Sequence, residues 1–396
     1  MELKNYTWHR IIFRILFYTA GPLVKRYFGY SCKKLKGPDT ASLVIANHNL
    51  DLDPALVALG FSRHMYFLSS EHALRAGFGS KILKLFFAPI SINKAKTDVT
   101  SIKEIIRRLK LGASVCLFAE GDRSFNGVTS PIALSMAKLA KTSGADLITF
   151  RIVGGYFTSP RWAKKMRKGK MTGTLVNKYS AEQLKTMSVK ELLGAIESDL
   201  YEDAYARQQM LPEQRELPGQ KETPQRYKGK NLAENIETTL YVCPGCKKIG
   251  TLKSEGDRFY CGCGLSGVYT DTGYLEGDSL PFSTITEWDK WQTAELAEII
   301  KNAGDKQICA DEDQLLFEIR PATGKTLVGE GPMSIDREAF YCAGSRFLLE
   351  DITRIVVAGQ MLLLFGLKEG ASYEVRSRTP RSALKYREIF RLLTGA

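Results

Sequence analysis

The sequence predicts an α/β layer fold for the first half of the chain, followed by a zinc ribbon and a small β-rich domain with a C-terminal helix. Three observations predict this organisation. Apolar strands alternate with helical segments over the first half, two cysteine pairs follow a polar stretch, and many short strands precede the last helix. A chain of 396 residues is long enough for two or three domains. The predicted divisions are residues 1–206, a linker or wrapping arm at 207–237, a ribbon at 238–275 and a β-rich domain at 276–396.

The first domain is predicted to alternate strands and helices. Apolar runs indicate the strands, and prolines at the first helical position indicate helix starts. Ser101 and Glu104 form a capping box that predicts another helix start. The predicted strands are 42–47, 65–68, 88–93, 114–119 and 147–153, and the predicted helices are 54–60, 81–87, one from Ser101, one from Ser130 to Gly144, and 188–205.

The last domain is predicted to be rich in short strands. A helix is expected from Glu287 to about residue 302, and Thr379-Pro380 predicts the start of a terminal helix. Strands closed by one C-terminal helix resemble a pleckstrin-homology or GRAM-type barrel, in architecture only. The predicted strands are 314–319, 326–329, 333–335, 339–342, 346–349, 353–357, 361–365 and 372–376.

The charge of the chain is positive and unevenly distributed. The formal net charge is +13, residues 1–40 hold eight Lys and Arg against two acidic residues, and residues 151–178 hold eight with no acidic residue. Such clusters attract polyanions, either nucleic acid or an anionic membrane surface. Tyr156, Phe157 and Trp162 lie in the second cluster and predict a contact with lipid headgroups. A solvated basic loop is the alternative.

The N-terminal segment favours the membrane surface over nucleic acid. Aromatic and aliphatic side chains interleave with Arg10 and Arg14, as in an interfacial amphipathic helix. The apolar stretch 11–24 is short for a membrane span, is interrupted by Arg14 and lacks the layout of a secretory signal. We therefore expect residues 1–30 to anchor a monotopic protein at the cytoplasmic face of the cell membrane. An ordinary core helix is the alternative.

The segment Asn47–Pro54 holds the first candidate catalytic group. It follows an apolar run and precedes a predicted helix, so His48 is expected in a strand-to-helix turn. A carboxylate that holds the Nδ1–H of a histidine raises its basicity, as a general base for a hydroxyl requires. Asp53 and Asp51 are rival partners. If Asp53 is the partner, His48 must precede the helix, because five helical residues separate side chains by about 140°. Asp53 is also suited to be a plain helix N-cap.

A second apolar run, 114–119, ends in residues suited to a substrate site. Gly121 permits a tight turn or a close substrate approach. Arg123 can form a bidentate contact with a phosphate. The alternative is an ordinary turn at the end of a strand with a solvated arginine.

Together the two segments resemble the glycerolipid acyltransferase family, whose best-known members are the lysophosphatidate acyltransferases. The family carries Asn-His, four further residues and Asp, which Asn47, His48 and Asp53 match. Its Phe-Pro-Glu-Gly-Thr-Arg-Ser motif matches 118–124, although Ala and Asp replace the Pro and the Thr. The resemblance covers about the first half of the chain.

Two further motifs of the family match less closely. The second usually ends in an arginine, and Lys94 stands there in this chain. Lysine also binds phosphate, but as a point charge without the planar fork of arginine. The fourth motif, an apolar strand, matches residues 147–154 loosely. The order and spacing of the motifs nevertheless agree with those of the family.

The resemblance implies transfer of an acyl group from acyl-CoA or acyl carrier protein to a lysophospholipid. The acceptor expected first is 1-acyl-sn-glycerol-3-phosphate, which is converted to phosphatidate. His48 would remove the proton from the acceptor hydroxyl, and Asp53 would orient the imidazole. Arg123 and Lys94 would hold the lipid phosphate, and Glu120 would fix the glycerol or the loop. The implied substrate-binding residues are Asn47, Lys94, Glu120, Gly121, Arg123 and Ser124.

Two cysteine pairs predict a structural zinc site. Cys243 and Cys246 are separated by fourteen residues from Cys261 and Cys263. Four thiolates in this layout are typical of a zinc ribbon, although the second pair is tighter than the usual Cys-x-x-Cys. Disulfides are the alternative, which a cytosolic type of chain disfavours. The other cysteines are predicted to be packing residues: Cys32, Cys116, Cys309 and Cys342.

Two functions from other classes compete with an enzyme. A catalytically inactive lipid-binding or scaffold protein could keep the same fold, but intact motif residues disfavour it. A nucleic-acid binder with a zinc ribbon agrees with the charge but not with the aromatic N-terminus, so no nucleic acid partner is expected. The expected partners are an anionic membrane surface, a lysophospholipid and the acyl donor.

Overall fold

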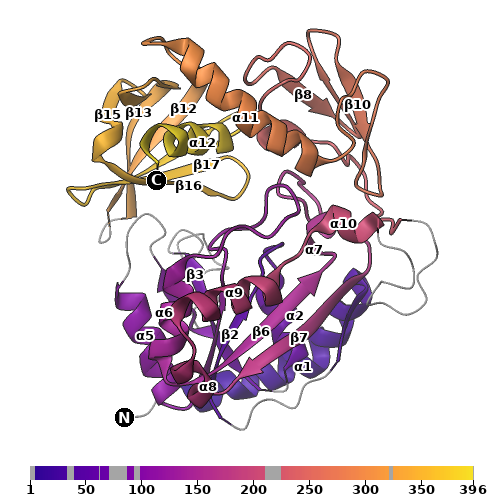
Figure 1. The fold of residues 1–396 in the computed structure, drawn as a ribbon, viewed down its shortest axis with the longest axis vertical. Helices are drawn as coiled ribbons and strands as arrows, with labels where there is room; N and C mark the ends of the chain where they lie inside the picture. Colours follow the sequence, from indigo (N-terminus) through magenta and orange to yellow (C-terminus); the bar gives the residue numbers. More distant parts are fainter. Residues whose placement is uncertain are drawn as a thin grey trace. The chain divides into compact units, whose positions relative to one another are not determined.

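The computed structural model describes residues 5–33, 40–61, 63–70, 87–92, 99–209, 224–320 and 324–395. They form two compact units (Figure 1). Unit 1 lies within residues 1–228, and unit 2 holds residues 229–396 together with 161–165. Unit 1 holds one sheet, and unit 2 holds two.

Unit 1 is built on a seven-stranded sheet in the order β1-β7-β6-β2-β5-β3-β4. Strands β2 to β6 run parallel, β7 is antiparallel to β6, and β1 is parallel to β7. This arrangement confirms the predicted α/β layer fold. The strands are β1 (Tyr30–Cys32), β2 (Ser42–Ala46), β3 (Met65–Ser70), β4 (Ile90–Ile92), β5 (Ser114–Phe118), β6 (Asp146–Val153) and β7 (Met171–Tyr179).

Helices cover both faces of this sheet (Figure 1). On β2, Leu43 and Ile45 join one core cluster, whereas Val44 and Ala46 join the other. Such double burial explains why the central strands are continuous apolar runs in the sequence. The first cluster is completed by α5 (Val99–Lys110), α6 (Leu134–Ser143), α8 (Ala181–Thr186) and α9 (Val189–Leu200), and the second by α1 (Tyr6–Phe28) and α2 (Asp53–Gly60).

Two predicted helix starts in unit 1 are wrong. Ser101 lies inside α5, and Glu104 pairs with Arg107 and Arg108, each at 2.7 Å, rather than capping the helix. The helix predicted from Ser130 begins only at Leu134. The predicted helix 81–87 lies outside the described residues except for its last residue.

The aromatic residues predicted to contact headgroups are buried instead. Tyr156 and Phe157 belong to the short helix α7 (Gly155–Thr158) and are each 1% exposed. Phe157 packs against Tyr205 of α10 (Ala204–Gln209), with ring centroids 5.0 Å apart. Trp162 is fully buried in unit 2, where its indole N–H donates to the carbonyl of Leu232 at 3.2 Å. The predicted contact is therefore wrong for all three aromatic residues, whereas Lys164, Lys165 and Lys168 of the same segment are exposed, as the alternative of a solvated loop expects.

Unit 2 begins with a packed segment and a small sheet. Tyr241 and Ile236 are buried, the latter in the 3-10 helix η2 (Ile236–Thr238). The sheet follows, with its strands antiparallel in the order β11-β10-β9-β8. Its strands are β8 (Leu252–Glu255), β9 (Arg258–Cys261), β10 (Ser266–Tyr269) and β11 (Leu275–Glu276).

The rest of unit 2 is a second seven-stranded sheet, antiparallel throughout, in the order β15-β14-β13-β12-β18-β17-β16. Seven strands replace the eight predicted, because 326–329 and 333–335 belong to one long strand, β13. The predicted resemblance to a pleckstrin-homology or GRAM barrel stays a prediction. The strands are β12 (Cys309–Arg320), β13 (Gly324–Ile335), β14 (Ala339–Cys342), β15 (Ser345–Leu348), β16 (Ile352–Ala358), β17 (Leu362–Leu367) and β18 (Ser372–Ser377), with the 3-10 helix η3 (Leu349–Asp351) before β16.

Two helices complete unit 2. The helix α11 (Ile285–Ala303) starts with a capping box between Thr284 and Glu287, and α12 (Leu384–Thr394) ends the described chain. Trp288 of α11 is fully buried and donates its indole N–H to the carbonyl of Val242 at 2.9 Å. In the described part of the chain, no helix combines the length and the apolar character needed to cross a membrane.

Candidate active site and metal centre

The candidate catalytic histidine lies at the carboxyl ends of the central parallel strands. His48 follows β2 and precedes α2, so it stands in a turn rather than in the helix. Neighbouring β5 ends at Phe118, and the segment Glu120–Ser124 follows it. Because parallel strands end at the same edge of a sheet, two segments more than seventy residues apart in sequence meet there.

Asp53 holds the imidazole in one orientation. Its Oδ2 lies 2.8 Å from Nδ1 of His48 and also accepts from the backbone N–H groups of Asn49 at 2.6 Å and Leu50 at 3.0 Å. The Asp53 side chain is fully buried, whereas 18% of the His48 side chain is exposed. With Nδ1 bonded to Asp53, Nε2 is the ring nitrogen left for a substrate.

A ring contact that was not predicted fixes the plane of the imidazole. The rings of His48 and Phe118 stack at a tilt of 21°, with centroids 4.4 Å apart. Phe118 belongs to the motif at residues 118–124 by its position, but no local pattern predicts that its ring stacks on the imidazole. The stacked ring restricts rotation of the imidazole about the bond to its Cβ, which leaves the hydrogen bond to Asp53 well aimed.

Glu120 clamps two backbone segments together. One carboxylate oxygen accepts from the N–H of His48 and the other from the N–H of Ser130, both at 2.7 Å. Burial raises the pKa of Glu120 to about 7, and the two backbone N–H groups oppose that rise. Of the two roles predicted for Glu120, this geometry supports fixing the loop. The N–H of Ser130 is a partner that sequence reasoning missed.

Arg123 faces a carboxylate at the same edge of the sheet. Its NH1 lies 3.1 Å from Oδ2 of Asp51, with 10% of the arginine side chain and 81% of the aspartate side chain exposed. Asp51 therefore contacts Arg123, and Asp53 accepts the hydrogen bond from Nδ1 of His48. The backbone N–H of Arg123 is held by Oδ1 of Asp122 at 3.0 Å.

Other predicted site residues shape the two turns. The amide of Asn47 bonds both backbone groups of Ile152 on β6, donating at 2.8 Å and accepting at 2.7 Å. The hydroxyl of Ser124 donates to the carbonyl of Val128, and its backbone N–H donates to the carbonyl of His48 at 3.1 Å. These residues hold backbone segments in place.

Gly121 and Lys94 are the remaining predicted residues. Gly121 has a φ of +67°, a left-handed conformation that favours glycine, and its N–H closes a turn onto the carbonyl of Phe118 at 3.2 Å. Lys94 lies outside the described residues, so its predicted phosphate contact stays a prediction.

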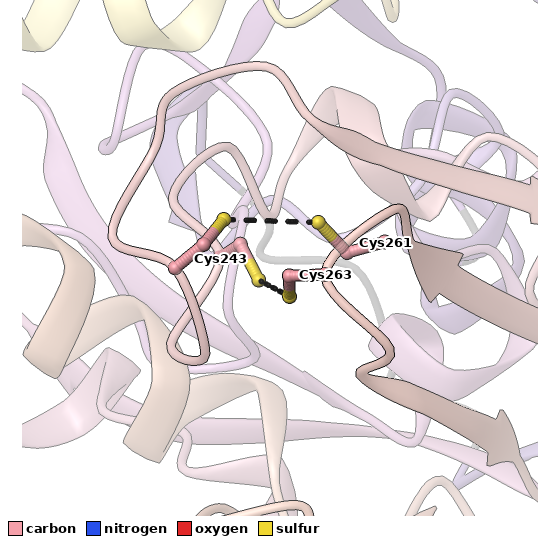
Figure 2. A group of neighbouring side chains, drawn as sticks. Cys243, Cys261 and Cys263 are labelled. Carbon is pink, nitrogen blue, oxygen red and sulfur yellow. Dashed lines mark hydrogen bonds between the residues drawn. The ribbon is translucent and has the colours of Figure 1, made fainter.

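The four cysteines of unit 2 converge on one point. The sulfurs of Cys243, Cys246, Cys261 and Cys263 all lie within 4.8 Å of one another, and Figure 2 shows three of these side chains turned inward. Cys243 and Cys263 are 3.6 Å apart, and Cys246 and Cys261 are 3.8 Å apart. Four sulfurs at about 2.3 Å from one tetrahedral zinc would be separated by about 3.8 Å. The sulfur positions therefore fit a four-thiolate metal site and are too far apart for disulfides.

The turns that carry the cysteines leave little free space. A Cβ at Gly245 would lie 3.1 Å from the sulfur of Cys263, so glycine lets the two turns approach. Thr251, which sequence reasoning missed, places its hydroxyl 3.3 Å from the sulfur of Cys261 and 3.8 Å from that of Cys246. A hydroxyl at that distance can donate to a metal-bound thiolate.

Comparison with known proteins gives a family match in unit 1. Residues 33–153 match the family model described as Acyltransferase. Among solved structures, the crystal structure of the 1-acyl-sn-glycerophosphate acyltransferase PlsC from Thermotoga maritima is similar, with 21% identity and a TM-score of 0.40. That match covers 47% of this chain and 75% of the other. No curated protein gives a significant match.

Proposed function

We propose that this chain, whose residues 33–153 match the acyltransferase family model, moves a fatty acyl group from an acyl thioester to the free hydroxyl of a lysophospholipid. The acceptor we propose first is 1-acyl-sn-glycerol-3-phosphate, which would give phosphatidate. The observation that carries the proposal is the 2.8 Å hydrogen bond between His48 and Asp53, with Arg123 following the neighbouring strand.

The proposed reaction is direct transfer with His48 as general base. Nε2 of His48 would take the proton from the acceptor hydroxyl as the oxygen attacks the thioester carbonyl. When the tetrahedral intermediate collapses, the carbon–sulfur bond breaks, and the same Nε2 would return the proton to the leaving thiolate. Asp53 would stabilise the imidazolium between the two steps. The donor would be acyl-CoA or acyl carrier protein.

Arg123 supports a phosphate-bearing acceptor. Its guanidinium lies at the same sheet edge as His48 and is mostly buried, so its geometry is restricted. A planar guanidinium with several N–H donors matches the oxygens of a phosphate. Holding the phosphate there would place the glycerol hydroxyl at a set distance from the base, which is how positioning lowers the barrier.

The helix α1 supports docking on a membrane. This helix packs against the rest of unit 1 through His9, whose Nδ1 lies 3.0 Å from the hydroxyl of Tyr66 on β3. Its other side exposes large apolar residues, and such surfaces in water-soluble domains mark interaction sites. We propose that this side lies in the headgroup region of the cytoplasmic face, with the protein peripheral. The exposed residues are Trp8, Ile11, Ile15, Leu16, Tyr18, Leu23 and Tyr27.

The cysteine cluster supports one zinc ion per chain with a structural role. Four protein ligands leave no coordination position for water or substrate, so zinc there would organise the fold of unit 2 rather than take part in acyl transfer. The thiolates of Cys243, Cys246, Cys261 and Cys263 would be the ligands.

Product analysis tests the proposed function. The full chain is incubated with palmitoyl thioester and a mixed panel of lysolipids, and the products are identified by mass spectrometry, with reactions lacking thioester as controls. We expect diacyl phospholipids, phosphatidate among them. If no lysolipid in the panel is acylated with either palmitoyl-CoA or palmitoyl acyl carrier protein, the alternative of a catalytically inactive lipid-binding protein is favoured.

Vesicle binding tests the proposed docking surface. Replacing Ile15 and Leu23 by serine should weaken binding to anionic vesicles by about tenfold for each side chain removed, because each loses its burial in the interface. Leu134→Ser is the matched control, since this leucine is 43% exposed on α6. Unchanged vesicle affinity in a folded double variant would contradict the role of α1.

A further inference from the structure

The acidic residue beside Arg123 has no part in the proposed proton transfer. Asp51 lies inside the first motif, between His48 and Asp53, yet its carboxylate contacts the arginine at 3.1 Å. The arginine is mostly buried and the aspartate is 81% exposed. The carboxylate therefore covers the guanidinium on its solvent side, from which an acceptor phosphate would approach.

This contact affects how a phosphate binds but does not exclude it. An ion pair with one highly exposed partner is weak, since water and salt screen it. A phosphate can therefore displace the carboxylate from Arg123. The displaced Asp51 keeps its charge and stays within a few ångströms, because it is fixed to the same short turn as His48. Every bound phosphate would then have a negative neighbour.

We propose that Asp51 determines which acceptor phosphates the site prefers, by disfavouring phosphate monoesters relative to phosphate diesters. The inference rests on the proposed function and deepens it. A lysophosphatidate is a monoester that carries nearly two negative charges at pH 7, whereas a lysolipid with an esterified headgroup carries one on its phosphate. Arg123 attracts both classes, and Asp51 repels the more highly charged one more strongly. Asp51 therefore reduces the preference for monoesters that Arg123 alone would give, so that phosphate diesters compete better as acceptors.

The size of the effect follows from the charge difference. Two unit charges about 5 Å apart at a water-exposed site interact weakly, and the interaction strengthens as water is excluded. For a difference of up to one charge between the two acceptors, we expect Asp51 to change their ratio of kcat/KM by roughly three- to tenfold at low salt. Added salt should shrink this factor, because both charges are near the surface.

The experiment compares two acceptors with the same acyl chain, lysophosphatidate and lysophosphatidylglycerol. The measured quantity is the ratio of kcat/KM for the first over the second, in the wild-type full chain and in Asp51→Asn. We expect the ratio to rise by roughly three- to tenfold in Asp51→Asn, through a lower KM for lysophosphatidate with little change in kcat. Asp51→Glu, which keeps the charge, should stay near the wild-type ratio.

Glu182→Gln is the matched charge control. Glu182 is 80% exposed on α8, pairs with Lys185 and makes no contact with Arg123 among the described residues. The Glu182→Gln variant removes one negative charge from unit 1, as Asp51→Asn does. It therefore reports any general effect of charge on the binding of anionic lipids. We expect its ratio to equal that of the wild type.

The outcomes separate the inference from the proposed function. An active wild type whose ratio does not change in Asp51→Asn overturns the inference and leaves the function standing. Equal losses with both acceptors, or an equal rise in Glu182→Gln, also overturn it, since they indicate a structural or a general charge effect. A wild type that acylates neither acceptor refutes the proposed function, and the inference falls with it. Asp51→Ala provides a second test if the asparagine variant is unstable.

Discussion

The histidine site of unit 1 and the cysteine cluster of unit 2 are assembled in opposite ways. The cluster comes from one stretch of 21 residues, Cys243–Cys263, and from two short turns. The histidine site needs β2, β5 and β6, whose contributing residues run from Asn47 to Ile152. A local cluster can be recognised from spacing alone, whereas a site at a sheet edge requires the whole sheet to be correct.

The two sites also differ in what they leave open. All four cysteine sulfurs face one another, so a metal there would have four protein ligands. In the histidine site Asp53 holds Nδ1 of His48, and the second ring nitrogen, Nε2, is left for chemistry. A closed site stabilises a fold, and a site with one open position can catalyse.

A large effect should come from Asp53→Asn. An asparagine could still accept from one donor, but it carries no charge to stabilise an imidazolium, and its amide can present an N–H to Nδ1 or to the backbone. We expect acyl transfer to fall by about 10²–10⁴-fold with zinc content unchanged, as typical of a disrupted general base. The loss is measured from initial rates of acyl transfer at a saturating concentration of the acyl thioester.

The matched control for this variant is Asp51→Asn, which removes a carboxylate of the same turn that contacts Arg123 instead of His48. Its rate with lysophosphatidylglycerol should stay within a few-fold of the wild type. A reversed order of the two variants would show that Asp51 is the functional partner of the histidine.

A second variant examines the cysteine cluster. Cys261→Ser should lower zinc from one ion per chain to well below one, as measured by elemental analysis, and destabilise unit 2 by several kcal/mol, because metal binding is coupled to folding of such small modules. The damage should spread beyond the ribbon, since Gln292 of α11 accepts from the N–H of Tyr241 at 2.9 Å.

Cys32→Ser is the control, because this cysteine lies in unit 1 and its thiol donates to the carbonyl of Leu59. It should retain full zinc. The ribbon interpretation would be refuted by wild-type protein without stoichiometric zinc, or by a disulfide between Cys243 and Cys246 under reducing expression.

A smaller effect is expected from Glu120→Gln, seen as a change in pH dependence. The pKa of Glu120 is raised from 4.5 to about 7 by burial, so the folded state binds this proton more tightly than the unfolded state does. Stability from this group is therefore fully present below pH 4.5 and is lost as the pH rises toward 7, by about 1.4 kcal/mol for each unit of pKa difference.

Glutamine cannot titrate, so the variant should lack this decrease between pH 4.5 and 7. Urea unfolding of unit 1 at several pH values measures it, with Glu182→Gln as a control that keeps the decrease. The variant should also lose about tenfold in acyl transfer, because one of the two clamped N–H groups, that of His48 or that of Ser130, loses its acceptor. Parallel pH curves for wild type and variant would contradict the assignment.

Much of the fold follows from local patterns in the sequence. Central strands such as 42–46 and 114–118 are apolar on both faces, and the cysteine spacing is characteristic, so both could be predicted. The strand β7 is missing from the predicted strands because it has no continuous apolar run, and its last six residues mix polar and apolar side chains that are partly or fully exposed. Trp162 was misassigned because an aromatic residue among lysines has the same local pattern whether it lies in a core or at a membrane.

The candidate site was predictable only in part. The identities of His48 and Asp53 come from a motif, but the choice between Asp53 and Asp51 depends on where α2 begins. The bonds from Glu120 to the backbone of His48 and Ser130 join segments distant in sequence. No local pattern encodes them, because the parallel pairing of β2 with β5 brings them together.

The most direct test of the account is the acyl-transfer rate of His48→Asn together with its zinc content. The asparagine amide can donate to Asp53 in place of Nδ1–H, so the turn keeps its hydrogen bond, but the variant has no Nε2 to accept a proton. We predict a rate at least 10²-fold below wild type, with an unchanged melting temperature, unchanged vesicle binding and one zinc ion per chain. A folded variant that transfers acyl groups at close to the wild-type rate would contradict the account, because the chemistry would then lie outside the histidine site.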